Sequence, residues 1–491
     1  MKRDLIQWHR WHPESFEKAA EAEKAVFLFV THAGCNWCAR MEQESFSDAE
    51  IIGVIERDFI PMRVDSYARP DVARYAHRIF AQMTGREAAD PLCLFLSPQK
   101  VPLYASAYLP DRDRDGMMGL RETLELVGKK YQSQKGLLLE KGGEILQALE
   151  TKDKSIRATR LDPSIASLVS TQIQSLYDSV HGGFGERPKF PRHTVLELLM
   201  DSLEKNGEGI TRKILGHTLD AMTEGALRDT ADGGFHHYCR DREWREPCRG
   251  KTLYNNALMA QILLRASQIL GEEKYRTYGV QTLRFIQEKF LKEGLFSSLY
   301  HEGTVEDKQV IVSWNAMAIR SLFLAGAHDR SYQQLAIESL SRLLEHGMQA
   351  GVLYHSFLPG ETPVIEAFLE DYAYMTDLLL LAYEQTHEKH YLTKASELIN
   401  EALRQYFNQG QWYCANKELA VPADTADGEY ASGLSVICGV LQKAVKYIDP
   451  AYKKFLLRTL EIHSYDLMRQ PISMPALTRV ALKQTEDNYK V

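Results

Sequence analysis

The sequence predicts two domains of different class, an α/β domain followed by an all-α domain built from paired helices. Short apolar, β-rich runs alternate with helical segments over roughly the first 110 residues, which indicates an α/β domain. Beyond about residue 160, a turn with glycine and an aromatic residue recurs between helical segments. The chain has 491 residues, more than one hydrophobic core usually organises. We expect domains at 1–125 and 161–491, joined by a helical linker at 126–160.

Composition narrows the classes of function. The formal charge of -7 argues against a nucleic-acid-binding surface, which normally carries an excess of basic residues. No apolar run approaches the roughly 18 residues of a membrane span, and the N-terminal segment lacks the apolar core of a secretory signal. Seven cysteines are few for this length. We therefore expect a cytoplasmic protein with no membrane or nucleic-acid partner, no cofactor and no metal.

The elements of the first domain follow from its apolar runs. Segment 26–30 is short, apolar and rich in β-formers, which predicts a buried strand. Further strands are predicted at 59–65, 92–96 and 101–108, and helices at 40–50 and 71–83. Strand, Cys-x-x-Cys, helix, strand, helix, proline, strand is the order of a thioredoxin-like fold.

The pair Cys35 and Cys38 follows the first strand directly and opens the first helix. A cysteine at the start of a helix has its thiolate stabilised by unpaired backbone N–H groups and the helix dipole. Two intervening residues bring the sulfurs within disulfide range. We expect Cys35 to be the exposed nucleophile and Cys38 the resolving thiol.

Three neighbours complete the predicted redox site. Pro91, before the third strand, is expected in cis, packed against the disulfide and shaping the contact with substrate. Asp65, at the end of a strand, is the candidate carboxylate for proton transfer, and Trp37 is expected to shield the disulfide. Two alternatives stay open: Cys-x-x-Cys is also half of many zinc sites, with His32 as a third ligand, and a thioredoxin fold can have little turnover.

The second domain repeats by pattern. The turns begin at Gly182, Gly233, Gly294, Gly351 and Gly410, about 50 to 60 residues apart. An amphipathic helix precedes each turn and an apolar helix follows it. Twelve helices as six hairpins between about 163 and 482 predict an (α/α)6 toroid with apolar inner helices, a solenoid being the alternative. All the turns would then gather at one mouth.

The first domain resembles the family of bacterial YyaL and spermatogenesis-associated protein 20, also called domain of unknown function 255. The resemblance rests on a colinear set of segments: Glu14-Ser15-Phe16-Glu17-Lys18-Ala19, Cys35-Asn36-Trp37-Cys38, Met41-Glu42, Glu44-Ser45-Phe46, Val64-Asp65, Arg69-Pro70-Asp71-Val72, Met83-Thr84-Gly85 and Pro91-Leu92. Asn36 and Ala39 stand where the family has histidines, and Ala88-Ala89-Asp90 replaces a Gly-Gly-Trp segment. Loss of two imidazoles beside the sulfurs alters the thiol chemistry, so the family's redox potential does not carry over.

The second domain resembles the same family in Gly182-Gly183-Phe184-Gly185, Pro188-Lys189-Phe190-Pro191, Asp232-Gly233-Gly234-Phe235-His236, Lys251, Asn256-Ala257, Ser313-Trp314-Asn315, Leu369-Glu370-Asp371-Tyr372-Ala373 and Ser432-Gly433. The resemblance implies a toroid of the six-hairpin glycosidase type, similar to sugar epimerases. Such enzymes use carboxylates and histidines around the mouth. The candidate substrate-binding residues there are His236, His237, Tyr254, Asn255, Trp314, Asn315, Glu370 and Asp371.

Simpler interpretations of the toroid residues remain open. Glu370-Asp371 is also a normal helix start, the His236-His237 pair can lie in a loop without a ligand, and the glycine turns can be turn chemistry alone. The family's His, Glu and Asp are Cys248, Gly250 and Asn255 here, which removes groups that acid–base catalysis needs.

Three hypotheses follow. The first is a thiol–disulfide oxidoreductase acting on a protein thiol or disulfide partner, with the toroid recruiting the substrate. The second is a carbohydrate-binding or carbohydrate-processing toroid for a small sugar-like ligand, with an accessory thioredoxin-like domain. The third is a scaffold in which both sites are silent.

Overall fold

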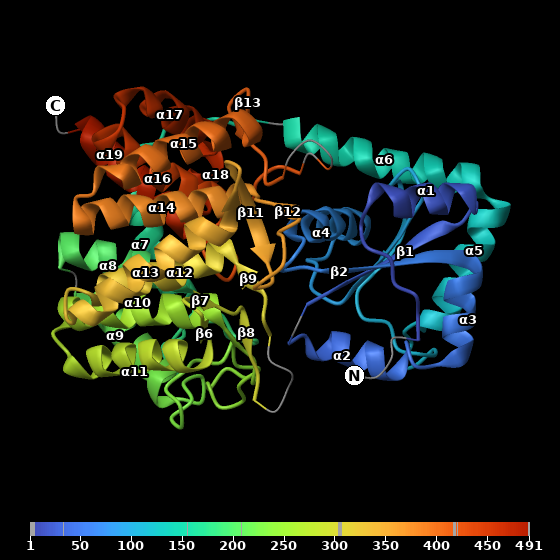
Figure 1. Ribbon diagram of the computed structural model, residues 1–491, viewed down its shortest axis with the longest axis horizontal. Helices are drawn as coiled ribbons and strands as arrows, with labels where there is room; N and C mark the ends of the chain where they lie inside the picture. The colour runs from blue at the N-terminus through green and yellow to red at the C-terminus, as the bar shows by residue number, and fades with distance from the viewer. Residues whose placement is uncertain are drawn as a thin grey trace. The chain divides into compact units, whose positions relative to one another are not determined.

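The computed structural model describes residues 5–32, 34–154, 156–207, 209–302, 307–415, 419 and 421–489. The chain divides into two compact units, Met1–Ser155 and Ile156–Val491. Figure 1 shows that the first unit combines helices with a small central sheet, whereas the second is dominated by helices. The predicted order of an α/β domain followed by an all-α domain is confirmed.

The sheet of the first unit has four strands in the order β2-β1-β3-β4. The central strand β1 (Ala25–Thr31) runs parallel to β2 (Phe59–Asp65) and antiparallel to β3 (Leu92–Leu96). The edge strand β4 (Pro102–Ser106) pairs antiparallel with β3. All seven residues of β1 are buried, as expected for a continuous apolar strand covered on both faces.

Six helices accompany the sheet within the described part of this unit: α1 (Pro13–Glu21), α2 (Asn36–Glu44), α3 (Ala49–Asp58), α4 (Pro70–Thr84), α5 (Leu120–Ser133) and α6 (Lys135–Lys154). Phe27 and Phe29 of β1 and Phe95 of β3 share one core with buried side chains of α2, α3 and α5. This packing fixes the start of α2 beside the end of β1.

Two parts of the first unit differ from the sequence expectation. Segment 40–50, predicted as one helix, contains the end of α2 and the start of α3, because Asp48 caps α3 by accepting hydrogen bonds from the N–H groups of Glu50 and Ile51. Segment 126–160, predicted as a linker, contains most of α5 and all of α6. Both helices pack onto unit 1, α5 against α3 and α6 against α4 and β4.

The second unit is a closed double ring of helices. The inner helices are α8 (His193–Asn206), α10 (Leu253–Leu270), α12 (Val312–Ala325), α14 (Leu369–Thr386), α16 (Gly433–Tyr447) and α19 (Pro475–Tyr489). Each contacts the next, and α19 contacts α8, which closes the ring. Figure 1 shows α10, α12 and α14 side by side in this ring. A toroid, not an open solenoid, is therefore the observed closure.

The outer helices are α7 (Ile165–Leu176), α9 (Gly209–Glu224), α11 (Glu273–Lys289), α13 (Arg330–Gly347), α15 (Lys389–Tyr406) and α17 (Lys453–Ile462). With the inner helices these make up the twelve expected helices. The described ranges of this unit also contain the short α18 (Ser464–Arg469) and two 3₁₀ turns, Pro450–Tyr452 and Pro471–Ser473. No helix in the described part of the chain is both long and apolar enough to cross a membrane.

The connections that lead from outer to inner helices carry short strands. These are β5 (Lys251–Thr252), β6 (Leu291–Lys292), β7 (Leu295–Phe296), β8 (Leu299–Tyr300), β9 (Val310–Ile311), β10 (Met348–Gln349), β11 (Val352–Phe357), β12 (Ile365–Glu366), β13 (Phe407–Asn408) and β14 (Gln411–Trp412). All five glycine–aromatic turns lie in these connections. They therefore gather at the N-terminal ends of the inner helices, which we call the mouth.

Candidate functional site

The predicted redox site of the first unit contains a disulfide between Cys35 and Cys38, whose Cα atoms are 5.2 Å apart. Cys35 is the N-cap residue of α2, and its sulfur accepts a hydrogen bond from the N–H of Cys38 at 3.1 Å. The side chain of Cys35 is half-buried, whereas Cys38 is only 2% exposed. Attack from outside therefore reaches Cys35 first, and the helix start offers an N–H donor to its thiolate.

Backbone pairing places Pro91 beside the redox site. Val30 pairs with Leu92 across the sheet. Pro91, one residue before Leu92 on the antiparallel strand, therefore lies next to the end of β1. The N–H of Cys35 bonds to the carbonyl of His32, just after that strand. The Asp90–Pro91 peptide bond is cis, as the sequence predicts.

A buried carboxylate that the sequence reasoning did not assign precedes this proline. Asp90 Oδ1 lies 2.9 Å from His77 Nε2, and the Asp90 side chain is 7% exposed. Burial alone would raise the pKa of Asp90, but hydrogen bonds from His77 and Ser66 and the nearby His32 together lower it. An Asp directly before the predicted cis-proline was the only sequence signal for this group.

Asp65 and Trp37 occupy different surroundings. Asp65 ends β2, and its Oδ1 accepts hydrogen bonds from the N–H groups of Tyr67 and Ala68 at 2.8 and 3.0 Å, which fixes a turn. The Trp37 ring is 52% exposed and packs against Tyr108, with ring centroids 4.8 Å apart. Arg40 stacks over the Trp37 ring at 5.4 Å. Trp37 and Arg40 on the first turns of α2, with the half-buried Tyr108 beside them, form an aromatic and cationic surface.

At the mouth of the toroid, several candidate residues hold backbone. Asn315 bonds both the N–H and the carbonyl of Phe296, and Asn255 donates to the carbonyl of His236. Asp371 accepts from the N–H of Phe368 at 2.9 Å and pairs with His355 at 2.8 Å, so it caps the start of α14. His236 is buried, and its nearest ion-pair partner, Asp229, is 3.8 Å away.

Four other candidates converge on one segment, 427–431, which we call the strap. The Glu429 carboxylate bonds the hydroxyl of Tyr254 and lies 2.8 Å from His237 Nε2. The next residue, Tyr430, donates its hydroxyl to Glu370 Oε1 at 3.0 Å and accepts from the Trp314 indole at 3.3 Å. The structure therefore brings Tyr254, His237, Trp314 and Glu370 together around two residues of the chain's own strap.

Sequence reasoning missed Glu429 and Tyr430. They precede the expected helix start at Ser432-Gly433, which marks only a helix boundary in sequence. Nearby, Asp427 anchors the strap by accepting hydrogen bonds from the N–H groups of Ser432 and Ala476. Burial raises the pKa of Asp427 to about 6, against the opposing effect of those hydrogen bonds.

The first glycine–aromatic turn is fastened by a buried ion pair. Lys189, fully buried, donates to Asp178 Oδ2 at 2.7 Å, and Arg242 pairs with the same carboxylate. Gly183 has φ +80°, and a Cβ there would lie 2.7 Å from the Trp244 ring, so only glycine fits this turn without a shift. The hydrogen bonds from Arg242 and Lys189 outweigh burial and hold the pKa of Asp178 well below its usual range.

The second such turn repeats the arrangement. Lys251 Nζ donates to Asp229 at 2.8 Å and to Asp232 at 2.7 Å. Lys189 and Lys251 are therefore equivalent: each follows one of two successive glycine turns and pairs with one or two aspartates that precede that turn.

The remaining cysteines are reduced and buried: Cys93, Cys239, Cys248, Cys414 and Cys438. Burial raises the pKa of the Cys93 thiol and that of Cys239, the latter to about 12, so both stay protonated at neutral pH. Within the described ranges, no group of three or more His, Cys, Asp or Glu side chains is arranged to hold a metal ion.

The chain resembles known proteins both in sequence and in structure. Residues 1–150 match the family described as "Protein of unknown function, DUF255". Spermatogenesis-associated protein 20 from Homo sapiens is 33% identical over 290 residues, which cover 57% of this chain and 37% of the human protein. The Rattus norvegicus protein of the same name is 32% identical and is covered to 36%. The match thus spans little more than a third of these relatives' length.

Solved structures resemble the toroid. Cellobiose 2-epimerase from Spirochaeta thermophila matches with a TM-score of 0.54 at 13% identity, covering 67% of this chain and 99% of that one. Cellobiose 2-epimerase from Bacillus thermoamylovorans has a TM-score of 0.55 at 12% identity, covering 66% and 97%. At these identities the likeness establishes the fold alone. Together the comparisons confirm the predicted resemblance: the chain is similar to spermatogenesis-associated protein 20, its first 150 residues match the DUF255 model, and its second unit has the helical toroid fold seen in the cellobiose 2-epimerases.

Proposed function

We propose that the protein is a thiol–disulfide oxidoreductase whose reactive centre is the Cys35–Cys38 pair. The observation that carries the proposal is the disulfide on the first turn of α2, with a half-buried Cys35 and a buried Cys38. An accessible first cysteine and a sheltered second one suit exchange through a mixed disulfide. The partner is a protein thiol or disulfide, and the setting we propose is the reducing cytoplasm.

The reaction balances as a two-electron exchange. In the reduced protein, the Cys35 thiolate attacks one sulfur of a substrate disulfide and releases the other as a thiolate, which takes up a proton. The Cys38 thiol then loses its proton and attacks the Cys35 sulfur. This step releases the second substrate thiol and forms the intramolecular disulfide seen here. An external dithiol must return two electrons for the next turnover, and the reverse sequence oxidises a substrate dithiol.

Neighbouring residues have distinct parts in this proposal. Trp37, with its exposed ring, and Pro91, beside the end of β1, form the contact surface for an extended substrate segment. The Asp90–His77 pair, which stands directly before Pro91, is a second candidate for the proton acceptor beside Asp65. The Asp65 carboxylate is engaged by two backbone N–H groups.

Reduction of insulin disulfides tests the proposal. With excess dithiol reductant, wild-type protein should accelerate the precipitation of insulin chains, and Cys35→Ser should abolish the acceleration. The variant Cys38→Ala should instead accumulate a mixed disulfide at Cys35, identified by peptide mass mapping. Cys93→Ala is the matched control, because Cys93 is buried and remains outside the redox pair. An insulin reduction rate that is equal in wild type and Cys35→Ser would rule the activity out.

A second candidate, carbohydrate binding or processing in the toroid, is favoured by one observation. Tyr254, His237, Trp314 and Glu370 form a cluster of aromatic rings, an imidazole and a carboxylate at the mouth. Glu429 bonds the first two and Tyr430 the last two. Such a mixture suits a sugar, and the solved structures of similar fold include sugar epimerases. Titration of cellobiose and mannose by calorimetry, with Glu370→Gln as the impaired variant, tests this candidate. No binding heat for either sugar with the wild type would exclude it, and equal heats for wild type and variant would exclude a role for Glu370.

A further inference from the structure

The interior of the toroid holds a cavity of about 1280 Å³ between the inner helices. Residues at its outer end, such as Lys205, Gln268 and His328, are exposed and lie at or just beyond the C-terminal ends of their helices. Residues at its inner end, such as His193 and Ser435, are buried. The cavity is therefore open at the end away from the mouth, and none of the eight predicted mouth residues lines it.

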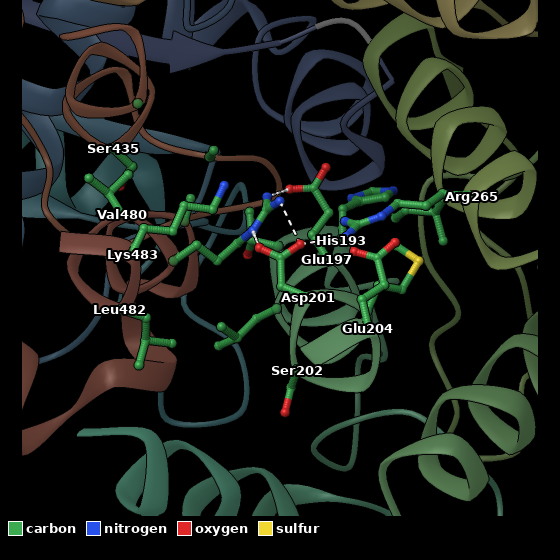
Figure 2. Close-up of a pocket in the computed structure, with 18 of the residues that line it drawn as sticks. His193, Glu197, Asp201, Ser202, Glu204, Arg265, Ser435, Val480, Leu482 and Lys483 are labelled. Atoms are coloured by element: carbon green, nitrogen blue, oxygen red, sulfur yellow. Dashed lines mark hydrogen bonds and ion pairs between the residues drawn. The ribbon is translucent and has the colours of Figure 1, made fainter. Parts of the chain in front are cut away.

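Two carboxylates inside this cavity are each shared between two cations. Asp201 pairs with Arg479 at 2.7 Å and with Arg265 at 2.6 Å. Asp377 pairs with Lys443 at 2.7 Å and with Arg320 at 3.0 Å. The cations come from four different inner helices. Figure 2 shows Asp201 and Glu204 of α8 beside Arg265, with Lys483 extending from α19.

The cavity walls carry N–H donors beyond those that these carboxylates use. Arg320 Nη1 lies at ion-pair distance from Asp377 but outside hydrogen-bond geometry, and it is buried without a hydrogen-bond partner among the residues that the structure describes. In the same part of the chain, Arg265 contacts its two carboxylates through Nη2, although a guanidinium has five N–H groups. No ion pair involves Lys483 among the described residues. The lining has six Lys and Arg side chains and five Asp and Glu side chains, so it is the unused N–H donors, more than the net charge, that suit an acceptor-rich anion.

At the closed end of the cavity the available group is an acceptor. His193 is 3% exposed, and its Nδ1 lies 3.0 Å from the carbonyl of Glu429, so Nδ1 carries the proton and donates it. Burial lowers the pKa of His193, which keeps the ring neutral. The Asn255 side chain lies near the ring, but Nε2 has no partner in hydrogen-bond geometry within the described part of the chain. A hydroxyl group is the natural donor to it.

A structural role alone does not explain these features. Ion pairs placed only to hold the ring together would leave neither a cavity of this size nor unused donors, and well-packed apolar residues would serve as well. Ligand pockets usually enclose about 300–1,000 Å³, so the space is ample for a metabolite.

From these contacts we propose that the cavity is a binding site for a small hydroxylated organic anion, such as a sugar phosphate or a sugar acid. Its oxyanion pairs with Lys483 and the free N–H groups of Arg265 and Arg320. A hydroxyl at its other end donates to His193 Nε2. The lining includes neither Cys35 nor Cys38 and none of the eight predicted mouth residues, and His193 connects it to the strap through the carbonyl of Glu429. The proposal is therefore independent of the redox proposal.

Calorimetry on the full chain tests the site with glucose 6-phosphate and gluconate as probes, against neutral glucose. We expect at least one anion to bind with a dissociation constant below the millimolar range and glucose to bind far more weakly. Lys483→Ala should weaken the anion about tenfold or more, the usual effect of losing a charge-assisted hydrogen bond. Lys389→Ala, an exposed lysine on α15 outside the cavity, is the matched control and should bind as wild type does.

A second variant protects the test against misfolding. Arg265→Lys keeps the charge beside Asp201 but removes the guanidinium fork, so it should lower affinity severalfold while its circular dichroism stays unchanged. Saturation by neither anion at millimolar concentration would overturn the proposal. Equal losses in Lys483→Ala and Lys389→Ala would overturn it as well, because they would reveal non-specific charge attraction.

Discussion

The buried pair beneath the first glycine turn gives the prediction with the clearest magnitude. Lys189→Met removes a hydrogen bond to Asp178 at 2.7 Å and one to the carbonyl of Arg242 at 2.9 Å. Asp178 keeps its bond from Arg242 Nε at 2.7 Å, so its charge is not left unpaired. A hydrogen bond to a charged group contributes about 1.5–3 kcal/mol, and the carbonyl adds a smaller loss. We therefore expect a cost of about 2–4 kcal/mol.

The opposite truncation should cost more. Asp178→Asn leaves a fully buried ammonium without its anion, for which about 3–5 kcal/mol is typical. Urea unfolding followed by tryptophan fluorescence measures both, since Trp244 lies 5.3 Å from Lys189 Nζ. Lys213→Met, on the exposed side of α9, is the control and should cost little. If Lys189→Met unfolds at the same urea concentration as wild type, the buried ion pair does not stabilise the turn. A smaller loss of stability in Asp178→Asn than in Lys189→Met would refute the role of the pair as well.

Three further predictions concern the toroid. Because the pKa of Asp427 is raised, the folded state binds the Asp427 proton more tightly than the unfolded state does. The contribution of Asp427 to stability is therefore present below about pH 4 and is lost as pH rises through 6. Between those pH values wild type should therefore lose roughly 3 kcal/mol relative to Asp427→Asn in urea titrations, and parallel pH profiles would contradict this. Gly183→Ala should lower the melting temperature, because its φ is positive and the added Cβ meets Trp244; an unchanged melting temperature would show that the turn relaxes. Glu429→Ala removes the side-chain bonds to Tyr254 and His237, so amide hydrogen exchange should rise in residues 427–431. Exchange equal to wild type would show that the strap is held by other contacts.

Local sequence patterns predicted much of the fold. Short apolar runs predicted β1, β2 and β3 within one residue at each end, because buried strands consist largely of consecutive apolar residues. The recurring turns predicted the inner and outer helices. Sequence reasoning missed the break before Asp48. Two helices separated by a few residues and an N-cap have the same local pattern in sequence as one longer helix.

The sites were predictable only where chemistry is local in sequence. Cys35 and Cys38 are three residues apart, so their spacing brings the sulfurs within disulfide range, and the order of strands and helices around them favoured the observed disulfide over a zinc site. Glu429 meets Tyr254 from 175 residues away, and this contact depends on closure of the ring. The cavity carboxylates Asp201 and Asp377 depend on the same closure, because their cations come from other helices.

The central claim is that Cys35 is an activated nucleophile at the start of α2. The most direct measurement is the pH dependence of its alkylation by iodoacetamide in reduced Cys38→Ala protein, followed by mass spectrometry of the Cys35 peptide. Free cysteine, measured in parallel, has a midpoint of about 8.5. We expect a clearly lower midpoint for Cys35, because the N-terminal N–H groups of α2 stabilise its thiolate. A midpoint equal to that of free cysteine would contradict it.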